Sequence, residues 1–172
     1  MDRQTRIEYL VGHYQRPRNK GALEDPEVSM PGGNPGCGDV VTMHVRADGE
    51  GKRLAGFAWE GDGCTISMAA ASILSEWMRR NDPLLNDILD FDYEAMIDLL
   101  GRDIVSTRPR CATLALGTLK AAIKKVLWNR RLLESEAASS EEADTGLVFG
   151  EDALSAAASG MGDRLKADRA AI

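Results

Sequence analysis

Three cysteines and one aspartate are the residues of this 172-residue chain with the clearest capacity for chemistry. Cys37 and Asp39 stand close together in the stretch NPGCGD, and Cys64 and Cys111 follow far along the chain. Three thiolates with one carboxylate can complete a tetrahedral Zn²⁺ site, or bind iron with the oxygen as the weakest donor. An odd number of distant cysteines is a poor disulfide framework and favours reduced thiols. We therefore expect these four residues to form a metal site or to present a reactive thiol.

A β-hairpin is predicted between the first two cysteines. VVTMHVRA shows strand residues with partial alternation, DGEGK supplies a turn, and RLAGFAWEG supplies the returning strand. Residues 3–11 show the pattern of a short amphipathic helix, and the segment after it is expected to be a loop as far as Pro35. Because helical patterns follow the hairpin, the chain predicts an α+β fold in which a small antiparallel β-sheet packs with α-helices.

Cys64 and Cys111 are both predicted at the beginning of a helix. Apolar residues recur at helical spacing over 65–80, and Pro109 favours the first position of a long helix. Unpaired backbone N–H groups and the helix dipole stabilise a thiolate there, and Arg108 adds positive charge near Cys111. We therefore expect the pKa of both thiols to lie below the usual value for cysteine.

Composition and charge limit the classes of partner. The chain is 44% hydrophobic, carries a formal net charge of −6 and has a pI near 5.0, which disfavours electrostatic binding to nucleic acid or to an anionic membrane. It has no apolar run suited to a bilayer and no apolar leader, so we expect a cytoplasmic protein. Residues 1–133 are predicted to form one domain, and residues 134–172 an acidic, alanine-rich tail that is partly helical or mobile.

Four sequence motifs resemble the U-type iron–sulfur cluster assembly proteins, the family of SufU, IscU and the N-terminal domain of NifU. In chain order they are HYQRPRNKG, NPGCGD, GDGCTISMAAAS and RPRCATL. The resemblance runs from Tyr9 to Val126 and is nearest to the SufU branch, because of GDGCTISMA after the hairpin, CATL at the third cysteine and Arg108 three residues before Cys111. In the IscU branch a histidine stands at the position of Arg110. The segment between the second and third cysteines is too short for the insertion usual in the SufU branch.

The resemblance implies a SufE/NifU/IscU-like fold with the metal site at one end. It also implies that Cys37, Asp39, Cys64 and Cys111 hold one Zn²⁺. The protein would accept persulfide sulfur from a PLP-dependent cysteine desulfurase of the SufS type. A histidine of the desulfurase would replace Cys37 as a ligand and leave a thiolate able to attack the persulfide. Cys37, with Arg108 near the site, is therefore the catalytic candidate.

Further partners expected from the resemblance are downstream cluster-assembly or acceptor proteins, and the protein is expected to be a monomer or a weak dimer. Three alternatives stay open. In a scaffold, the same four residues would bind a transient [2Fe–2S] cluster, with Asp39 as the weak donor that keeps it releasable. A structural zinc-binding module is the second alternative, and a thiol redox enzyme is the third, although the chain has no CxxC pair. The protein would be at most a zinc-dependent sulfurtransferase, and otherwise a scaffold.

Overall fold

The computed structural model describes the backbone of residues 2–144 and the side chains of residues 2–137. Its elements, in chain order, are α1 (Arg3–Gln15), β1 (Val28–Asn34), β2 (Asp39–Ala47), β3 (Leu54–Asp62), α2 (Thr65–Asn81), α3 (Leu85–Asp90), α4 (Tyr93–Leu100), α5 (Arg102–Val105) and α6 (Pro109–Asp144). The chain divides into two compact units, Met1–Arg131 and Leu132–Ile172. Among the described residues, no helix combines the length and the apolar character that a membrane span requires.

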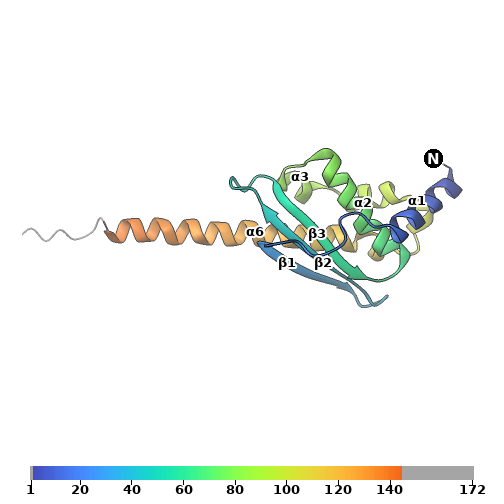
Figure 1. The fold of residues 1–172 in the computed structure, drawn as a ribbon, viewed down its shortest axis with the longest axis horizontal. Helices are drawn as coiled ribbons and strands as arrows, with labels where there is room; N and C mark the ends of the chain where they lie inside the picture. Colours follow the sequence, from blue (N-terminus) through green and yellow to red (C-terminus); the bar gives the residue numbers. More distant parts are fainter. Residues whose placement is uncertain (1, 145–172) are drawn as a thin grey trace, which may run out of the picture. The chain divides into compact units, whose positions relative to one another are not determined.

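The three strands form one antiparallel sheet with β2 in the centre. Figure 1 shows them side by side, with the first part of α6 passing along one face of the sheet. The predicted hairpin is present as β2 and β3, and the α+β class predicted from the sequence is confirmed.

The hydrophobic core lies between this sheet and the two longest helices of the first unit. Fully buried side chains from β2, α2 and α6 include Val41, Met43, Val45, Leu74, Leu116, Leu119 and Ile123. Alanines on α2 and α6 are also fully buried, which lets the helix backbones approach the sheet closely. Each large aliphatic side chain contributes about 1.5–3 kcal/mol on burial. We therefore expect the fold to persist without a bound metal.

The segment expected to be a loop as far as Pro35 contains the edge strand β1, so that expectation is wrong. Pro31 and two glycines make VSMPGGN a poor strand sequence. At an edge, however, proline is tolerated where its nitrogen faces away from the neighbouring strand. A Cβ atom at Gly32 would clash with the side chain of Thr118 on α6, so glycine lets β1 approach this helix.

Helix α6 continues past residue 133, where the acidic tail was expected to begin. Residues 134–144, the first part of the tail predicted to be partly helical or mobile, are helical, because the alanine and glutamate of ESEAASSEEAD are strong helix formers. Residues 145–172, the rest of the predicted tail, lie outside the described residues. The tail domain therefore stays a prediction.

A buried polar chain ties the segment after α1 to α2. The backbone N–H of Arg18 donates to Ser72 Oγ over 2.8 Å, and Ser72 Oγ lies 2.7 Å from His13 Nδ1. His13 Nε2 lies 3.3 Å from a carboxylate oxygen of Glu76. A neutral imidazole protonated on Nε2 satisfies every group in this chain. Burial lowers the pKa of His13, and the nearby Glu76 charge opposes that shift without overcoming it.

Acidification should destabilise the protein through His13. Its folded-state pKa lies below the ordinary value of 6.5, so the unfolded chain binds more protons. The contribution of His13 to stability is therefore complete above pH 6.5 and is lost as the pH falls below that value. We expect the Tm of the wild type to fall more steeply on acidification than that of His13→Gln, as measured by circular dichroism. An equally steep fall of Tm with pH in His13→Gln and in the wild type would contradict the role of His13.

Candidate metal centre

Four segments deliver the residues that the sequence singled out. Cys37 lies in the turn between β1 and β2, and Asp39 is the first residue of β2. Cys64 is the N-cap of α2, and Cys111 lies in the first turn of α6. The turn is closed by the backbone N–H of Cys37, which donates to the carbonyl of Asn34 over 3.0 Å. Cys37 is exposed, Cys64 is half-buried and Cys111 is buried, so the site extends from the surface into the core.

The structure brings Cys37, Asp39 and Cys111 together as a group. One ligand atom from each lies within 4.8 Å of the others, and the sulfur atoms of Cys37 and Cys111 are 3.2 Å apart. Cys64 stands beside this group, with its sulfur 3.5 Å from Asp39 Oδ2, but its sulfur does not belong to the mutually close set. The geometry thus assembles three of the four predicted ligands and places the fourth against the carboxylate.

The backbone of Arg108 lies next to the site. Its carbonyl accepts hydrogen bonds from the N–H groups of Cys111 and Ala112 at 3.1 and 3.2 Å, which places it at the beginning of α6. Its side chain is exposed. A role for the guanidinium in sulfur transfer stays a prediction.

Asp39 is held at both of its carboxylate oxygens. The backbone N–H of Cys64 donates to Oδ1 over 2.9 Å, and the hydroxyl of Ser67 donates to Oδ2 over 2.6 Å. Burial alone would raise the pKa of Asp39, but the hydrogen bonds from Ser67, Cys64 and Cys111 outweigh it and lower that pKa. Asp39 is therefore an ionised oxygen donor at neutral pH although only 2% of its surface is exposed.

The expectation of a lowered pKa at Cys111 is wrong. Burial is the largest cause of a strongly raised pKa, and interactions with Asp39, Cys37 and Cys64 raise it further. The helix dipole and Arg108 do not compensate, because Cys111 is only 1% exposed whereas the arginine side chain lies in solvent. A thiolate at Cys111 therefore needs a strong positive charge in direct contact, as a bound metal ion would supply.

Sequence reasoning missed two polar residues that support the site. Asn34 is buried, and its side-chain N–H lies 3.4 Å from the sulfur of Cys111. Ser67 donates a hydrogen bond to Asp39. The position of Ser67 three residues after Cys64 was an available signal, because residues at this spacing share one side of a helix. No comparable signal connected Asn34 with Cys111.

The donor set fits the metal predicted from the sequence. Three cysteine sulfurs and one carboxylate oxygen are ligands that Zn²⁺ accepts in tetrahedral sites. Thiolates are also the usual ligands of iron–sulfur clusters. The scarcity of oxygen donors does not suit Mg²⁺ or Ca²⁺. Cys37, Asp39, Cys64 and Cys111 would therefore suit zinc or an iron–sulfur cluster.

Gly63 is required by the close approach of Asp39. A Cβ atom at position 63 would lie 2.7 Å from Asp39 Oδ1, closer than non-bonded atoms allow. We expect Gly63→Ala to displace the carboxylate and weaken zinc binding by about 10- to 100-fold, the usual cost of disturbing a ligand's support. Competition with a chromophoric chelator measures this affinity. Gly36→Ala is the matched control, because its Cβ would make only an ordinary contact with Asn34. Wild-type affinity in Gly63→Ala would refute the requirement.

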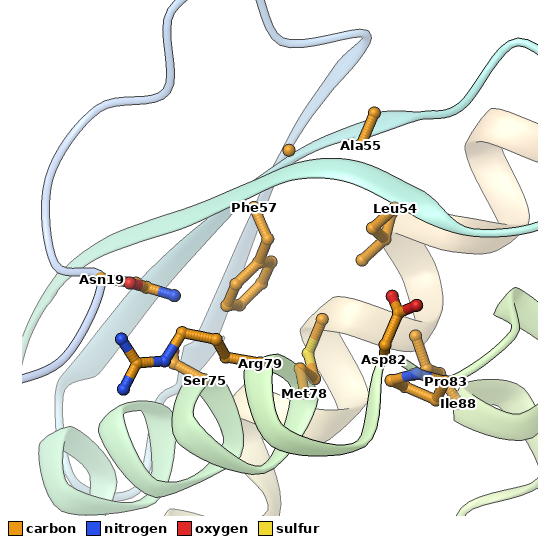
Figure 2. Close-up of a pocket in the computed structure, with 11 residues that line it drawn as sticks. Asn19, Leu54, Ala55, Phe57, Ser75, Met78, Arg79, Asp82, Pro83 and Ile88 are labelled. Carbon is orange, nitrogen blue, oxygen red and sulfur yellow. The ribbon is translucent and has the colours of Figure 1, made fainter.

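A separate cavity of about 290 Å³ lies between β3 and the C-terminal part of α2. Figure 2 shows Leu54 and Phe57 projecting from β3 toward Met78 on α2, with Arg79 and Asn19 at the rim. None of the four candidate ligands lines this cavity. The candidate metal centre instead opens to the surface at Cys37, which suits contact with another macromolecule.

A family profile and several curated relatives match this chain. The profile of the NifU-like N terminal domain matches residues 7–131. The zinc-dependent sulfurtransferase SufU of Bacillus subtilis is 32% identical over 131 residues, covering 67% of this chain and 87% of that protein. The iron–sulfur cluster assembly scaffold protein IscU of Aquifex aeolicus is 30% identical over 127 residues, covering 74% of this chain and 79% of that protein.

Solved structures share the same fold. FiSufU from Fervidobacterium islandicum superimposes with a TM-score of 0.56 at 22% identity, covering 67% of this chain and 94% of that chain. The N-terminal part of a NifU-like protein from Brucella abortus gives a TM-score of 0.56 at 18% identity, covering 69% and 92%. The arrangement of sheet and helices is therefore common to these proteins.

Proposed function

Since the chain belongs to the family of NifU-like N-terminal domains, we propose that it is an iron–sulfur cluster assembly protein that accepts persulfide sulfur from a PLP-dependent cysteine desulfurase of the SufS type. The observation that carries this proposal is the grouping of Cys37, Asp39 and Cys111 beside Cys64, with the thiol of Cys37 exposed. The relative from Bacillus subtilis bears the name of a zinc-dependent sulfurtransferase. Because the proposed reaction needs reduced thiols, we place the protein in the cytoplasm.

One Zn²⁺ would be held by Cys37, Asp39, Cys64 and Cys111. When bound, the ion keeps the coordinating thiols deprotonated, against the burial that raises the pKa of Cys111. Asp39 is already ionised and supplies the one oxygen donor.

Cys37 is the residue that a partner's persulfide can reach, because it is the one exposed cysteine of the three. Its thiolate attacks the outer sulfur of the desulfurase persulfide and forms a new S–S bond. The S–S bond of the donor breaks, and the donor cysteine leaves as a thiolate with the bonding electron pair. No external oxidant is consumed. Arg108, exposed at the beginning of α6, supplies positive charge for the anionic persulfide. Downstream assembly or acceptor proteins then take the sulfur.

Mass spectrometry of the protein after incubation with a cysteine desulfurase and cysteine tests the transfer. We expect one added sulfur on the wild type and none on Cys37→Ala. Arg108→Ala should slow the addition more than Arg110→Ala, a matched exposed arginine two positions away. Sulfur addition to Cys37→Ala at the wild-type rate would assign the transfer to another residue.

A cluster scaffold is the second candidate, and the likeness to IscU of Aquifex aeolicus favours it. The same four residues would bind a transient [2Fe–2S] cluster, with Asp39 as the donor that soft iron holds least tightly. Anaerobic reconstitution with iron and sulfide distinguishes the candidates. Cluster absorbance that appears in the wild type and increases in Asp39→Ala would support a scaffold. Absence of cluster absorbance from both proteins would exclude a scaffold.

A further inference from the structure

We propose that Ser67 is a positioning residue that sets how firmly Asp39 holds a metal ion. This inference rests on the metal site of the proposed function and adds a residue outside the four ligands. Ser67 is 1% exposed and lies in the first turn of α2, three residues after Cys64. Its hydroxyl donates to Asp39 Oδ2 over 2.6 Å, a length typical of a charge-assisted hydrogen bond to a carboxylate.

Two hydrogen bonds fix the orientation of the Asp39 carboxylate. Ser67 holds Oδ2 and the backbone N–H of Cys64 holds Oδ1, so the group cannot rotate without breaking one of them. Each oxygen keeps a second lone pair. The aspartate can therefore still donate to a metal ion, but from an orientation that α2 imposes.

Ser67 also connects the aspartate with the third cysteine. Its Oγ lies 3.2 Å from the backbone carbonyl oxygen of Cys111, so one side chain stands between β2 and the first turn of α6. It is itself carried by the helix that Cys64 caps. Ser67 thus contacts segments that supply three of the four proposed ligands.

Loss of the hydroxyl should loosen Asp39 without changing any ligand. The carboxylate would lose its shortest hydrogen bond, and the oxygen donor would dissociate from the metal more often. Outer partners of metal ligands typically alter metal binding by about 10- to 100-fold. We expect chelator-driven metal loss from Ser67→Ala to be faster than from the wild type by about this factor.

The chain offers a matched control on the same helix. Ser75 is fully buried, and its hydroxyl donates over 2.8 Å to the carbonyl of Ala71 within α2. Ser75→Ala removes a buried hydroxyl of the same kind away from the proposed ligands. A general effect of serine loss on the helix would therefore appear equally in both variants.

The test uses the full chain loaded with Co²⁺, whose absorption reports the ligands directly. We expect Ser67→Ala to shift the Co²⁺ absorption bands and to lose metal to EDTA faster, whereas Ser75→Ala does neither. In the Asp39→Ala background, Ser67→Ala should add no further change, because it acts through Asp39. If Ser67→Ala does not fold, Ser67→Thr and Ser67→Val provide a pair of similar shape in which only threonine keeps the hydroxyl and the wild-type spectrum.

The outcomes separate this inference from the proposed function. Suppose that Ser67→Ala keeps the wild-type Co²⁺ spectrum and rate of metal loss, whereas Asp39→Ala changes both. This result would overturn the role of Ser67 and leave the metal site intact. An equal effect of Ser67→Ala in the presence and absence of Asp39 would also overturn it. Failure of the wild type to bind Co²⁺ or Zn²⁺ would instead overturn the metal site.

Discussion

Cys64→Ala is expected to lower zinc affinity by more than about 100-fold, as severely as Cys111→Ala. Loss of a direct ligand should exceed the cost of disturbing an outer partner, because the remaining donors leave one coordination position to water. Of the two variants, Cys64→Ala gives the sharper test. The sulfur of Cys64 lies beside Asp39 but outside the group formed by Cys37, Asp39 and Cys111. Zinc content after dialysis and chelator competition measure the effect, with Ser75→Ala as the control that should retain the metal.

Near-wild-type affinity in Cys64→Ala would contradict a four-residue site. The ligand set would then be Cys37, Asp39 and Cys111, the three residues that the structure already groups. In that case Cys64 would act only through its backbone N–H, which holds Asp39 Oδ1.

Removal of zinc is expected to lower the Tm but to leave the protein folded. The core between β2, α2 and α6 is apolar, and its large side chains are none of the four ligands, although Cys111 borders it. A ligand present at a thousand times its Kd stabilises a fold by about 4 kcal/mol, which corresponds to a Tm change on the order of 10 °C for a chain of this size. Thermal melting followed by circular dichroism, with and without a chelator, measures this change.

The same experiment addresses the structural zinc module. Complete loss of the helical signal on chelation, restored by added zinc, is the behaviour of a module that folds around its metal. That result would contradict the proposed sulfur acceptor as described. Leu74→Ala provides the comparison, because loss of a fully buried core leucine should cost about 2–5 kcal/mol whether or not zinc is bound.

Patterns that are local in the chain predicted the elements that carry the cysteines. The β2–β3 hairpin followed from strand residues around a turn, and α2 and α6 followed from helical periodicity and from Pro109. Strand β1 was missed because its sequence contains Pro31 and Gly32, which disfavour a strand. The segment is extended because it pairs with β2 at the edge of the sheet and packs on Thr118. Such pairing between separate segments leaves no local signature.

The sequence singled out residues that the structure brings near one another, but it did not predict their electrostatics. NPGCGD places Cys37 and Asp39 close together in any fold, whereas their meeting with Cys111 depends on the topology. The raised pKa of Cys111 results from burial, which the arginines flanking it in the sequence do not reveal. The spacing of Ser67 from Cys64 indicates a shared side of the helix, but the contact of Ser67 with Asp39 depends on how α2 packs against β2.

Sulfide release from a cysteine desulfurase tests the central claim most directly. The desulfurase is assayed with cysteine and a dithiol reductant, in the presence of the wild type or of Cys37→Ala, Asp39→Ala, Cys64→Ala and Cys111→Ala. A persulfide sulfur accepted by Cys37 is released as sulfide when the dithiol reduces the S–S bond. We predict a several-fold stimulation by the wild type and none by Cys37→Ala. Absence of stimulation by the wild type, or equal stimulation by Cys37→Ala, would contradict the account.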